Sequence, residues 1–146
     1  RKPPAAALHA SPDDVEAQFY EALQRGDIAL LMAVWADDDE IVCVHPGGGR
    51  LVGAAQIRES FEAIFANGGV PAQPEKIHRL QTLTSAVHHL VERIAVQGPE
   101  GEQQAWVLAT NVYLKTAEGW RLVAHHASPA DADDLHPAAE GPSTLH

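Results

Sequence analysis

The chain has 146 residues, of which 45% are hydrophobic, and this is enough apolar surface for one globular core. Its 20 acidic and 10 basic residues give a formal charge of −10, and the Lys and Arg residues are scattered, so we expect no nucleic-acid partner. No apolar run approaches the roughly 20 residues needed to cross a bilayer, so we expect no membrane partner. The single Cys43 cannot form an intramolecular disulfide, so folding does not depend on oxidation and we expect a cytoplasmic location.

The first predicted element is a helix that begins after Ser11. A proline and two aspartates follow this serine, which favours a helix start because the serine caps the backbone and the carboxylates face the positive end of the helix dipole. Apolar residues then recur at helical spacing up to Gly26, which ends the helix, and Asp27 can cap the next one. That second helix carries Ile28, Leu31, Met32 and Trp35.

Short strands and a third helix are predicted in the middle of the chain. Residues 41–45 are mostly β-branched and precede a proline and three glycines, which indicates a strand followed by a turn. Residues 51–53 form a second short candidate strand. Helical spacing returns from Ile57 to Phe65 and stops at Asn67-Gly68-Gly69.

The pattern changes to that of strands from Lys76 onward. Three or four long strands are predicted, at about residues 76–85, 87–97, 103–116 and 120–128. Helices concentrated before an antiparallel sheet favour an α+β architecture over a βαβ crossover fold. We expect one domain at residues 12–130, between flexible tails at residues 1–11 and 131–146.

Several short motifs occur in a fixed order along these elements. They are Gly26-Asp27, residues 35–39, Val44-His45-Pro46 leading to Gly53 and Ile57, residues 110–113, and the closing run at residues 119–128. On these motifs, the chain from about residue 12 to residue 130 resembles the nuclear transport factor 2-like (SnoaL-like) superfamily. The final strand, with a His two residues before a Ser, is most similar to the association domain of calcium/calmodulin-dependent protein kinase II and its stand-alone bacterial relatives. No kinase signature is present.

The resemblance implies a cone-shaped, curved antiparallel sheet wrapped around a long helix, with two further N-terminal helices. It also implies a pocket on the concave side and, in many such proteins, a dimer through the convex side. The functions of this superfamily include isomerases, dehydratases, polyketide cyclases, transport factors and oligomerisation modules. Function therefore has to be argued from the site.

Three side chains are candidates for a catalytic site: His45, Asn111 and His126. His45 ends a predicted buried strand and can exchange a proton near neutral pH, or it can simply bond the glycine turn that follows. Asn111 can donate to a carbonyl oxygen or to a neighbouring strand. Alternation along the last strand places His126 inside the cone and His125 outside. Inside the cone, His126 can bond a ligand, or its two ring nitrogens can be hydrogen-bonded within the core.

Aromatic side chains are candidates for the wall of a substrate pocket, although the same spacing is typical of plain core. They are Phe19, Trp35, Phe61 and Tyr113. The pattern of ketosteroid isomerase, which this chain resembles, has Tyr, Asp and an acid where Phe19, His45 and Asn111 stand here. Phe19 has no hydroxyl to donate and Tyr20 points about 100° away, so steroid isomerisation is disfavoured.

Metal and cofactor chemistry are not predicted. The nine histidines include the adjacent pairs His88-His89 and His125-His126, and neighbours in a strand face opposite sides, so neither pair readily supplies two ligands to one ion. We assign no metal and no cofactor.

Two functions from different classes remain open. The first is a homodimeric protein that binds a small apolar or carbonyl-containing molecule, with a cofactor-independent isomerase or lyase acting by proton transfer as the corresponding enzyme class. The alternative is a non-catalytic oligomerisation or protein-interaction module like a kinase association domain. Both use an apolar outer sheet face, which we expect to be buried between two copies through Trp106, Leu108, Val112 and Leu114.

Overall fold

The computed structural model describes residues 9–131 and residue 135. Its helices are α2 (Pro12–Arg25), α3 (Ile28–Met32) and α4 (Ala54–Phe65). Its strands are β1 (Val42–Val44), β2 (Arg50–Val52), β3 (Ala72–Gln81), β4 (Ser85–Gly98), β5 (Gly101–Thr116) and β6 (Gly119–Ala130). This α+β composition confirms the predicted fold class.

The ends of the first two helices follow the predicted capping chemistry. The Ser11 hydroxyl accepts a hydrogen bond from the Asp14 backbone at 3.1 Å, and Gly26 closes α2 with a φ of 68°. Only glycine adopts this left-handed conformation without strain. The Asp27 carboxylate then accepts from the Leu30 backbone at 3.0 Å and starts α3. Local sequence therefore fixes where α2 ends and α3 begins.

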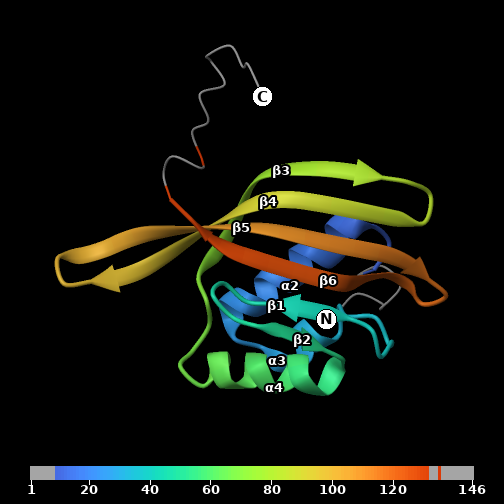
Figure 1. The fold of residues 1–146 in the computed structure, drawn as a ribbon, viewed down its shortest axis with the longest axis horizontal. Helices are drawn as coiled ribbons and strands as arrows, with labels where there is room; N and C mark the ends of the chain where they lie inside the picture. The colour runs from blue at the N-terminus through green and yellow to red at the C-terminus, as the bar shows by residue number, and fades with distance from the viewer. Residues whose placement is uncertain (1–8, 132–134, 136–146) are drawn as a thin grey trace, which may run out of the picture.

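The six strands form one curved sheet in the order β2-β1-β6-β5-β4-β3 (Figure 1). Strands β3 to β6 form the predicted antiparallel meander. Strand β1 is the exception to an antiparallel sheet, because it pairs with β6 in parallel. These two strands are far apart in the chain, so no hairpin turn fixes their relative direction. The joined ends of β4 and β5 project beyond the rest of the sheet as a two-stranded ribbon (Figure 1).

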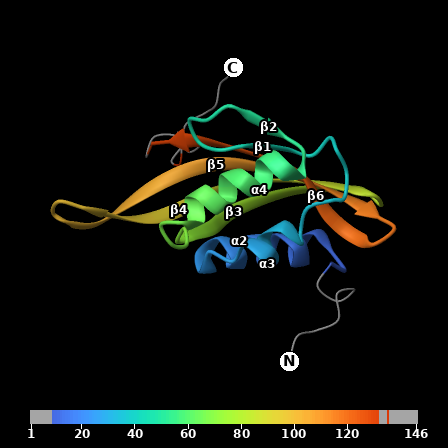
Figure 2. The ribbon, with the colours of Figure 1, turned by 90° about the horizontal axis from the view of Figure 1, so that it is seen from below.

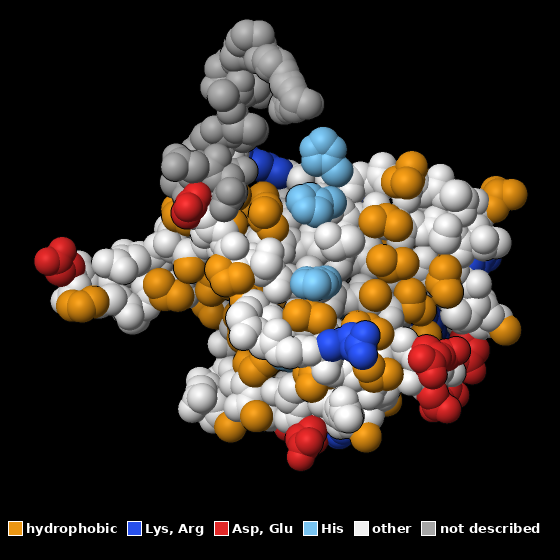
Figure 3. All heavy atoms as spheres, viewed as in Figure 1, with side chains coloured by type: hydrophobic (Ala, Val, Ile, Leu, Met, Phe, Trp, Pro, Cys, Tyr) orange, Lys and Arg blue, Asp and Glu red, His pale blue; other side chains and the backbone are white. Residues whose placement is uncertain are grey.

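The helices α2 and α3 cover one face of the sheet, and α4 lies near its β1–β2 end (Figure 2). The core lies between this face and the helices, where Val15, Phe19 and Leu31 are fully buried. The opposite face has no helix over it in this view, and hydrophobic side chains gather there among histidines (Figure 3). The two faces of the sheet therefore have different environments: the inner face packs against α2 and α3, and the outer face has no helix over it in this view.

The first long strand begins at Ala72, four residues before its predicted start. Pro71 precedes this strand and Pro74 lies within it, although proline cannot donate a hydrogen bond to a sheet. In the structure β3 is an edge strand, so proline is tolerated there. The pairing of β3 with β4 also shifts between Glu75 and His78.

The last strand contains one extra residue that changes which side chains point inward. Val112 pairs with Ala124, but Tyr113 pairs with Leu122, so Val123 is the extra residue of a β-bulge. Because side chains alternate along a strand, the residues after the bulge face the opposite way from strict alternation.

The expected tails lie almost entirely in residues 1–8, 132–134 and 136–146, outside the described residues. Two described residues near them contact the domain. The Trp120 backbone donates to the His9 carbonyl at 2.9 Å, and the Lys76 ammonium donates to the Leu135 carbonyl at 3.2 Å. None of the helices within the described part of the chain has the length and apolar character that a membrane crossing requires.

Candidate functional site

A row of polar side chains crosses the inner face of the sheet. Arg79 on β3 pairs with His88 on β4, His88 pairs with Asn111 on β5, and Asn111 pairs with His125 on β6. Directly paired residues share a face, so these four side chains point toward α2. Cys43 on β1 is paired with His125 and continues the row.

Helix α2 presents two polar side chains to this row. Glu16 and Tyr20 are four residues apart, so they lie on the same face of the helix. Both are buried, with exposed fractions of 3% and 2%. The Tyr20 hydroxyl accepts a hydrogen bond from the Asn111 amide at 3.3 Å. It donates to the Glu92 carboxylate at 2.7 Å.

The Glu16 carboxylate is the centre of the hydrogen bonding. Its Oε2 atom accepts from the Tyr113 hydroxyl at 2.7 Å and from the Asn111 amide at 3.2 Å. It also lies 3.0 Å from His88 Nδ1. A carboxylate oxygen only accepts, and each of these three groups can donate, so the arrangement suits an ionised Glu16.

A second buried carboxylate, Glu92, lies behind Tyr20. Burial raises the pKa of Glu92 from 4.5 to about 7, the Tyr20 hydrogen bond opposes that rise, and the charge of Glu16 adds to it. Burial also raises the pKa of Tyr20 well above its ordinary value. With its pKa raised to about 7, Glu92 can be either protonated or ionised near neutral pH.

His125 completes the cluster as a neutral group. Its Nδ1 atom is hydrogen-bonded to the Asn111 side-chain oxygen, and its Nε2 atom lies 3.9 Å from Glu92. Burial, together with the positive charges of His45 and His126, lowers the pKa of His125 to about 3. We use the name buried network for Glu16, Tyr20, His88, Glu92, Asn111, Tyr113 and His125.

One pocket opens onto the buried network between α2 and β3. Its volume is about 280 Å³, and its lining residues are Asp13, Glu16, Ala17, Pro74, Ile77 and Arg79. Arg79 Nε lies 2.9 Å from an Asp13 oxygen, and both of these side chains are exposed. Glu16 thus connects the pocket to the hydrogen-bonded groups behind it.

The same place contains a group of side chains that could hold a metal ion. Among the residues that the structure describes, Asp13, Glu16 and His88 each offer one ligand atom, and these atoms lie within 4.8 Å of one another. Asp13 already pairs with Arg79. Three groups already bond Glu16 Oε2, so an ion held by that same oxygen would have to replace one of these contacts.

Comparison with known proteins establishes the family. The SnoaL-like domain matches residues 13–132, which is most of the chain. The chain belongs to the SnoaL-like family.

Solved structures agree with this membership. A candidate calcium/calmodulin-dependent protein kinase type II association domain from Thiobacillus denitrificans is 32% identical, with a TM-score of 0.76, covering 84% of this chain and 97% of that one. A candidate dehydratase of the NTF2-like family from Streptomyces avermitilis is also 32% identical, with a TM-score of 0.72, covering 81% and 93%. The CaMKII hub of S. rosetta, 19% identical with a TM-score of 0.64 over 89% and 98%, shares the fold. No curated protein matches the chain.

Asn111 of this SnoaL-like protein points inward as predicted, but His126 does not. Asn111 is fully buried, whereas His126 is exposed and His125 is buried at 4% exposure. The prediction that His126 lies inside and His125 outside is wrong, because the bulge at Val123 reverses the alternation. His125 is the histidine that bonds Asn111.

His45 is half-buried at the end of β1, away from the pocket lined by Glu16. Its Nε2 atom lies 2.9 Å from the Ser60 hydroxyl of α4, and its ring packs edge-on against Phe61 with 4.8 Å between centroids. Burial lowers the pKa of His45. The structure therefore does not bring His45, Asn111 and His126 together as neighbours.

The predicted aromatic wall is part of the core. Phe19 contacts the His125 ring with 5.0 Å between centroids and Phe61 with 6.3 Å. Trp35 is 5% exposed and forms a bridge with Leu122 of β6. Tyr113 instead uses its hydroxyl on Glu16. A role of these residues in binding a substrate remains a prediction.

The comparison with ketosteroid isomerase took the wrong residue of α2. Tyr20, and not Phe19, supplies a phenolic hydroxyl to the interior. Both residues are buried because α2 packs deep in the fold, so a rotation of about 100° does not bring Tyr20 to the surface. The argument against steroid isomerisation from a missing hydroxyl therefore fails.

Of the buried network, only Asn111 and Tyr113 were predicted from the sequence, although two local signals were available for other members. Glu16 and Tyr20 stand four residues apart, next to the apolar stripe of α2. His88 and Glu92 alternate with the fully buried Leu90 on β4. Polar residues within a buried stripe predict an internal hydrogen-bonded cluster. His125 offered no such signal because of the bulge.

Proposed function

We propose that this SnoaL-like protein binds a small molecule in the pocket between α2 and β3, and that the buried network behind it serves the bound molecule. The observation that supports this proposal is the double role of Glu16. Its side chain lines the pocket, and its carboxylate bonds three groups of the network. A concave site with a few convergent polar groups is typical of ligand binding.

The reaction class proposed for this site is proton transfer without a cofactor, as in an isomerase or a lyase. Glu16 is the group proposed to take the proton, since its carboxylate lines the pocket and is within reach of a bound molecule. Asn111 and Tyr20 connect Glu16 to Glu92 through hydrogen bonds. In this proposal Asn111 and Tyr20 are positioning residues.

Binding can be tested with a fragment library that contains amines, carboxylic acids, alcohols and ketones. Backbone amide signals in ¹H–¹⁵N NMR spectra should shift at Ala17, Ile77 and Arg79, and Glu16→Gln should weaken binding. Glu21→Gln is the matched control, because Glu21 lies on the same helix but is exposed and paired with Arg25. Fragments that leave all three amides unchanged would contradict the proposed pocket.

Proton transfer needs a separate measurement. Bound carbonyl compounds should exchange a carbon-bound hydrogen with D₂O, detected by NMR of the compound. Glu16→Gln should abolish this exchange in the compounds that it still binds, whereas Glu92→Gln should leave binding within about twofold, because Glu92 does not line the pocket. Equal exchange rates for the wild type and Glu16→Gln, each saturated with the compound, would exclude Glu16 as the proton acceptor.

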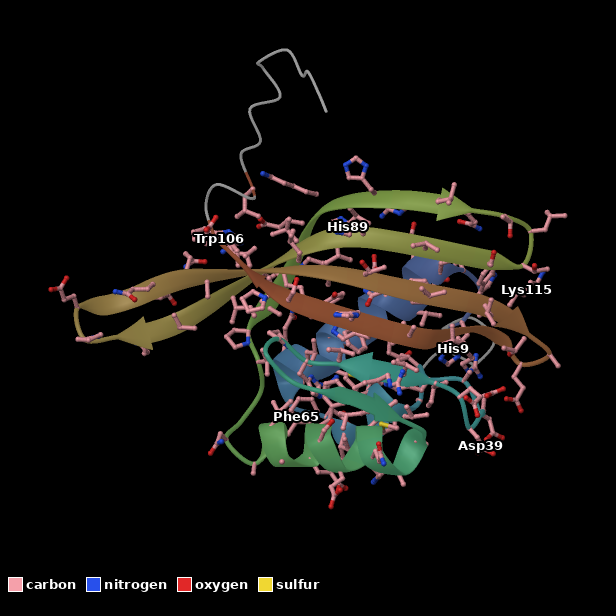
Figure 4. The ribbon with its side chains drawn as sticks, viewed as in Figure 1. His9, Asp39, Phe65, His89, Trp106 and Lys115 are labelled. Carbon is pink, nitrogen blue, oxygen red and sulfur yellow. The ribbon has the colours of Figure 1, made fainter. Side chains whose placement is uncertain are left out.

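A second candidate function is an association module, and the outer sheet face favours it. Trp106 lies where the β4–β5 ribbon leaves the sheet (Figure 4). Trp106, Leu108 and Val112 are half-buried, and Leu114 is 42% exposed. We propose that this face is shared by two copies of the chain, because an apolar sheet face in water is costly.

Sedimentation tests the association module. The wild type should form a dimer at micromolar concentration, and Leu108→Asp should form a folded monomer because it places a charge in the interface. Glu102→Gln, on an exposed part of β5, should leave the dimer intact. A wild-type monomer at 100 μM would refute this candidate.

A further inference from the structure

The pocket between α2 and β3 is rich in acidic groups. Asp13 and Glu16 both line it, and ligand atoms from these two carboxylates and from His88 lie within 4.8 Å of one another. The one cationic side chain in its wall is Arg79, which pairs with Asp13 at 2.9 Å. That ion pair is exposed at both ends, so solvent screens it and it contributes little.

The floor of the pocket carries a negative charge that no fixed cation neutralises among its hydrogen-bond partners in the described residues. The partners of Glu16 are Tyr113, Asn111 and His88. The first two are neutral, and His88 carries a charge only when protonated. Glu92 lies behind them as a second buried carboxylate that interacts electrostatically with Glu16. A cation is the charge that this floor attracts.

The rest of the pocket wall is apolar. Ala17 comes from α2, and Pro74 and Ile77 come from β3. This surface gives nothing to a bare ion but suits the carbon part of an organic molecule. The volume of about 280 Å³ allows a molecule with one small ring or a short chain.

We propose that the pocket binds the protonated amine of a small organic molecule, with the ammonium group against Glu16 and Asp13 and the carbon part against Ala17, Pro74 and Ile77. This proposal rests on the proposed function and names the chemical class of its ligand. An ammonium group donates up to three hydrogen bonds, which matches carboxylate oxygens from two residues.

Two other occupants fit less well. An anion would meet the Glu16 and Asp13 carboxylates, with Arg79 as its only fixed cationic contact in the wall. A divalent metal could use ligand atoms of Asp13, Glu16 and His88, but it would leave the apolar wall of the pocket without a contact. An amine uses both parts of the pocket, because the contacts described above involve one oxygen of each carboxylate and the apolar wall receives its carbon part.

The test compares three probes that share one ring and differ in charge: benzylamine, benzyl alcohol and benzoate. Each is titrated into the full chain at pH 7 and followed by ¹H–¹⁵N NMR. Benzylamine should shift the amides of Ala17 and Ile77 with a dissociation constant at least about tenfold lower than that of benzyl alcohol, the gain expected for a hydrogen bond to a charged group. Benzoate should bind more weakly than the alcohol.

Variants assign the preference to the carboxylates. Glu16→Gln should make benzylamine and benzyl alcohol bind equally, whereas Glu21→Gln should retain the preference. Asp13→Asn is a second variant that does not disturb the core, because Asp13 is exposed, and it should reduce the preference severalfold.

Four results would overturn the proposal. Equal or tighter binding of benzyl alcohol or benzoate at these amides would show that the pocket is real but does not select an amine. Zn²⁺ binding at Asp13, Glu16 and His88 without amine binding would replace the amine by a metal. An amine preference that survives both Glu16→Gln and Asp13→Asn would remove the carboxylates from the explanation. Shifts from none of the probes would reject the proposed pocket itself.

Discussion

Replacing Glu92 by glutamine should change how the stability of the protein depends on pH. Burial raises the pKa of Glu92 from 4.5 to about 7, so the folded state holds this proton more tightly than the unfolded state. The stabilising contribution of Glu92 is thus fully present below pH 4.5 and is lost as the pH rises through 7. At about 1.4 kcal/mol for each pH unit, the full contribution is about 3 kcal/mol.

Urea unfolding of the wild type and Glu92→Gln at about pH 5 and about pH 8.5 measures this contribution. Glutamine does not titrate, so the difference in free energy of unfolding between the two proteins should change by about 2.5 kcal/mol between these pH values. The variant gains relative stability at the higher pH. His125, whose lowered pKa is about 3, acts in the opposite direction as the pH falls below 6.5. It is present in both proteins and cancels in the comparison.

Glu21→Gln is the control variant for this test. Glu21→Gln removes a carboxylate whose side chain is 57% exposed, and its effect should stay within about 0.5 kcal/mol at both pH values. If the difference between the wild type and Glu92→Gln is the same at both pH values, Glu92 titrates alike in the folded and unfolded states. The reasoning from burial would then be refuted.

Three further substitutions test the packing around the site by urea unfolding. Tyr20→Phe removes the donor to Glu92 and should lower the free energy of unfolding by about 1 to 3 kcal/mol; an unchanged value would show that this bond does not form. Gly69→Ala drives its Cβ atom into the backbone oxygen of Gln24 in α2 and should cost more than about 2 kcal/mol, whereas the matched control Gly49→Ala, with nothing within 4 Å, should cost less than about 0.5 kcal/mol. Ser11→Ala removes the cap of α2 and should cost about 1 kcal/mol; no loss would contradict the capping argument.

Features governed by local chemistry could be predicted from the sequence. The cap at Ser11, the end of α2 at Gly26 and the cap at Asp27 each depend on residues within one helical turn. The inward direction of Asn111 followed from simple alternation along β5, which is regular around that residue. These features need no knowledge of the rest of the fold.

Features governed by distant pairing could not be predicted in the same way. The bulge at Val123 inserts one residue into β6, and a shift of one residue exchanges His125 for His126 on the inner face. The row from His88 through Asn111 to His125 depends on the register of three strands. Strand register is a property of the whole sheet, so the contact between His125 and Asn111 was not predicted, whereas Glu16, Tyr20, His88 and Glu92 had local signals in the sequence.

A crystal structure of the protein with benzylamine is the most direct test of whether a small molecule binds beside Glu16. We expect the ring between α2 and β3 and the amine nitrogen about 3 Å from a Glu16 carboxylate oxygen, the distance of a charge-assisted hydrogen bond. Density for benzylamine elsewhere, such as the pocket at the end of the molecule where His9 and Lys115 lie (Figure 4), with the Glu16 pocket filled by water alone, would contradict binding beside Glu16.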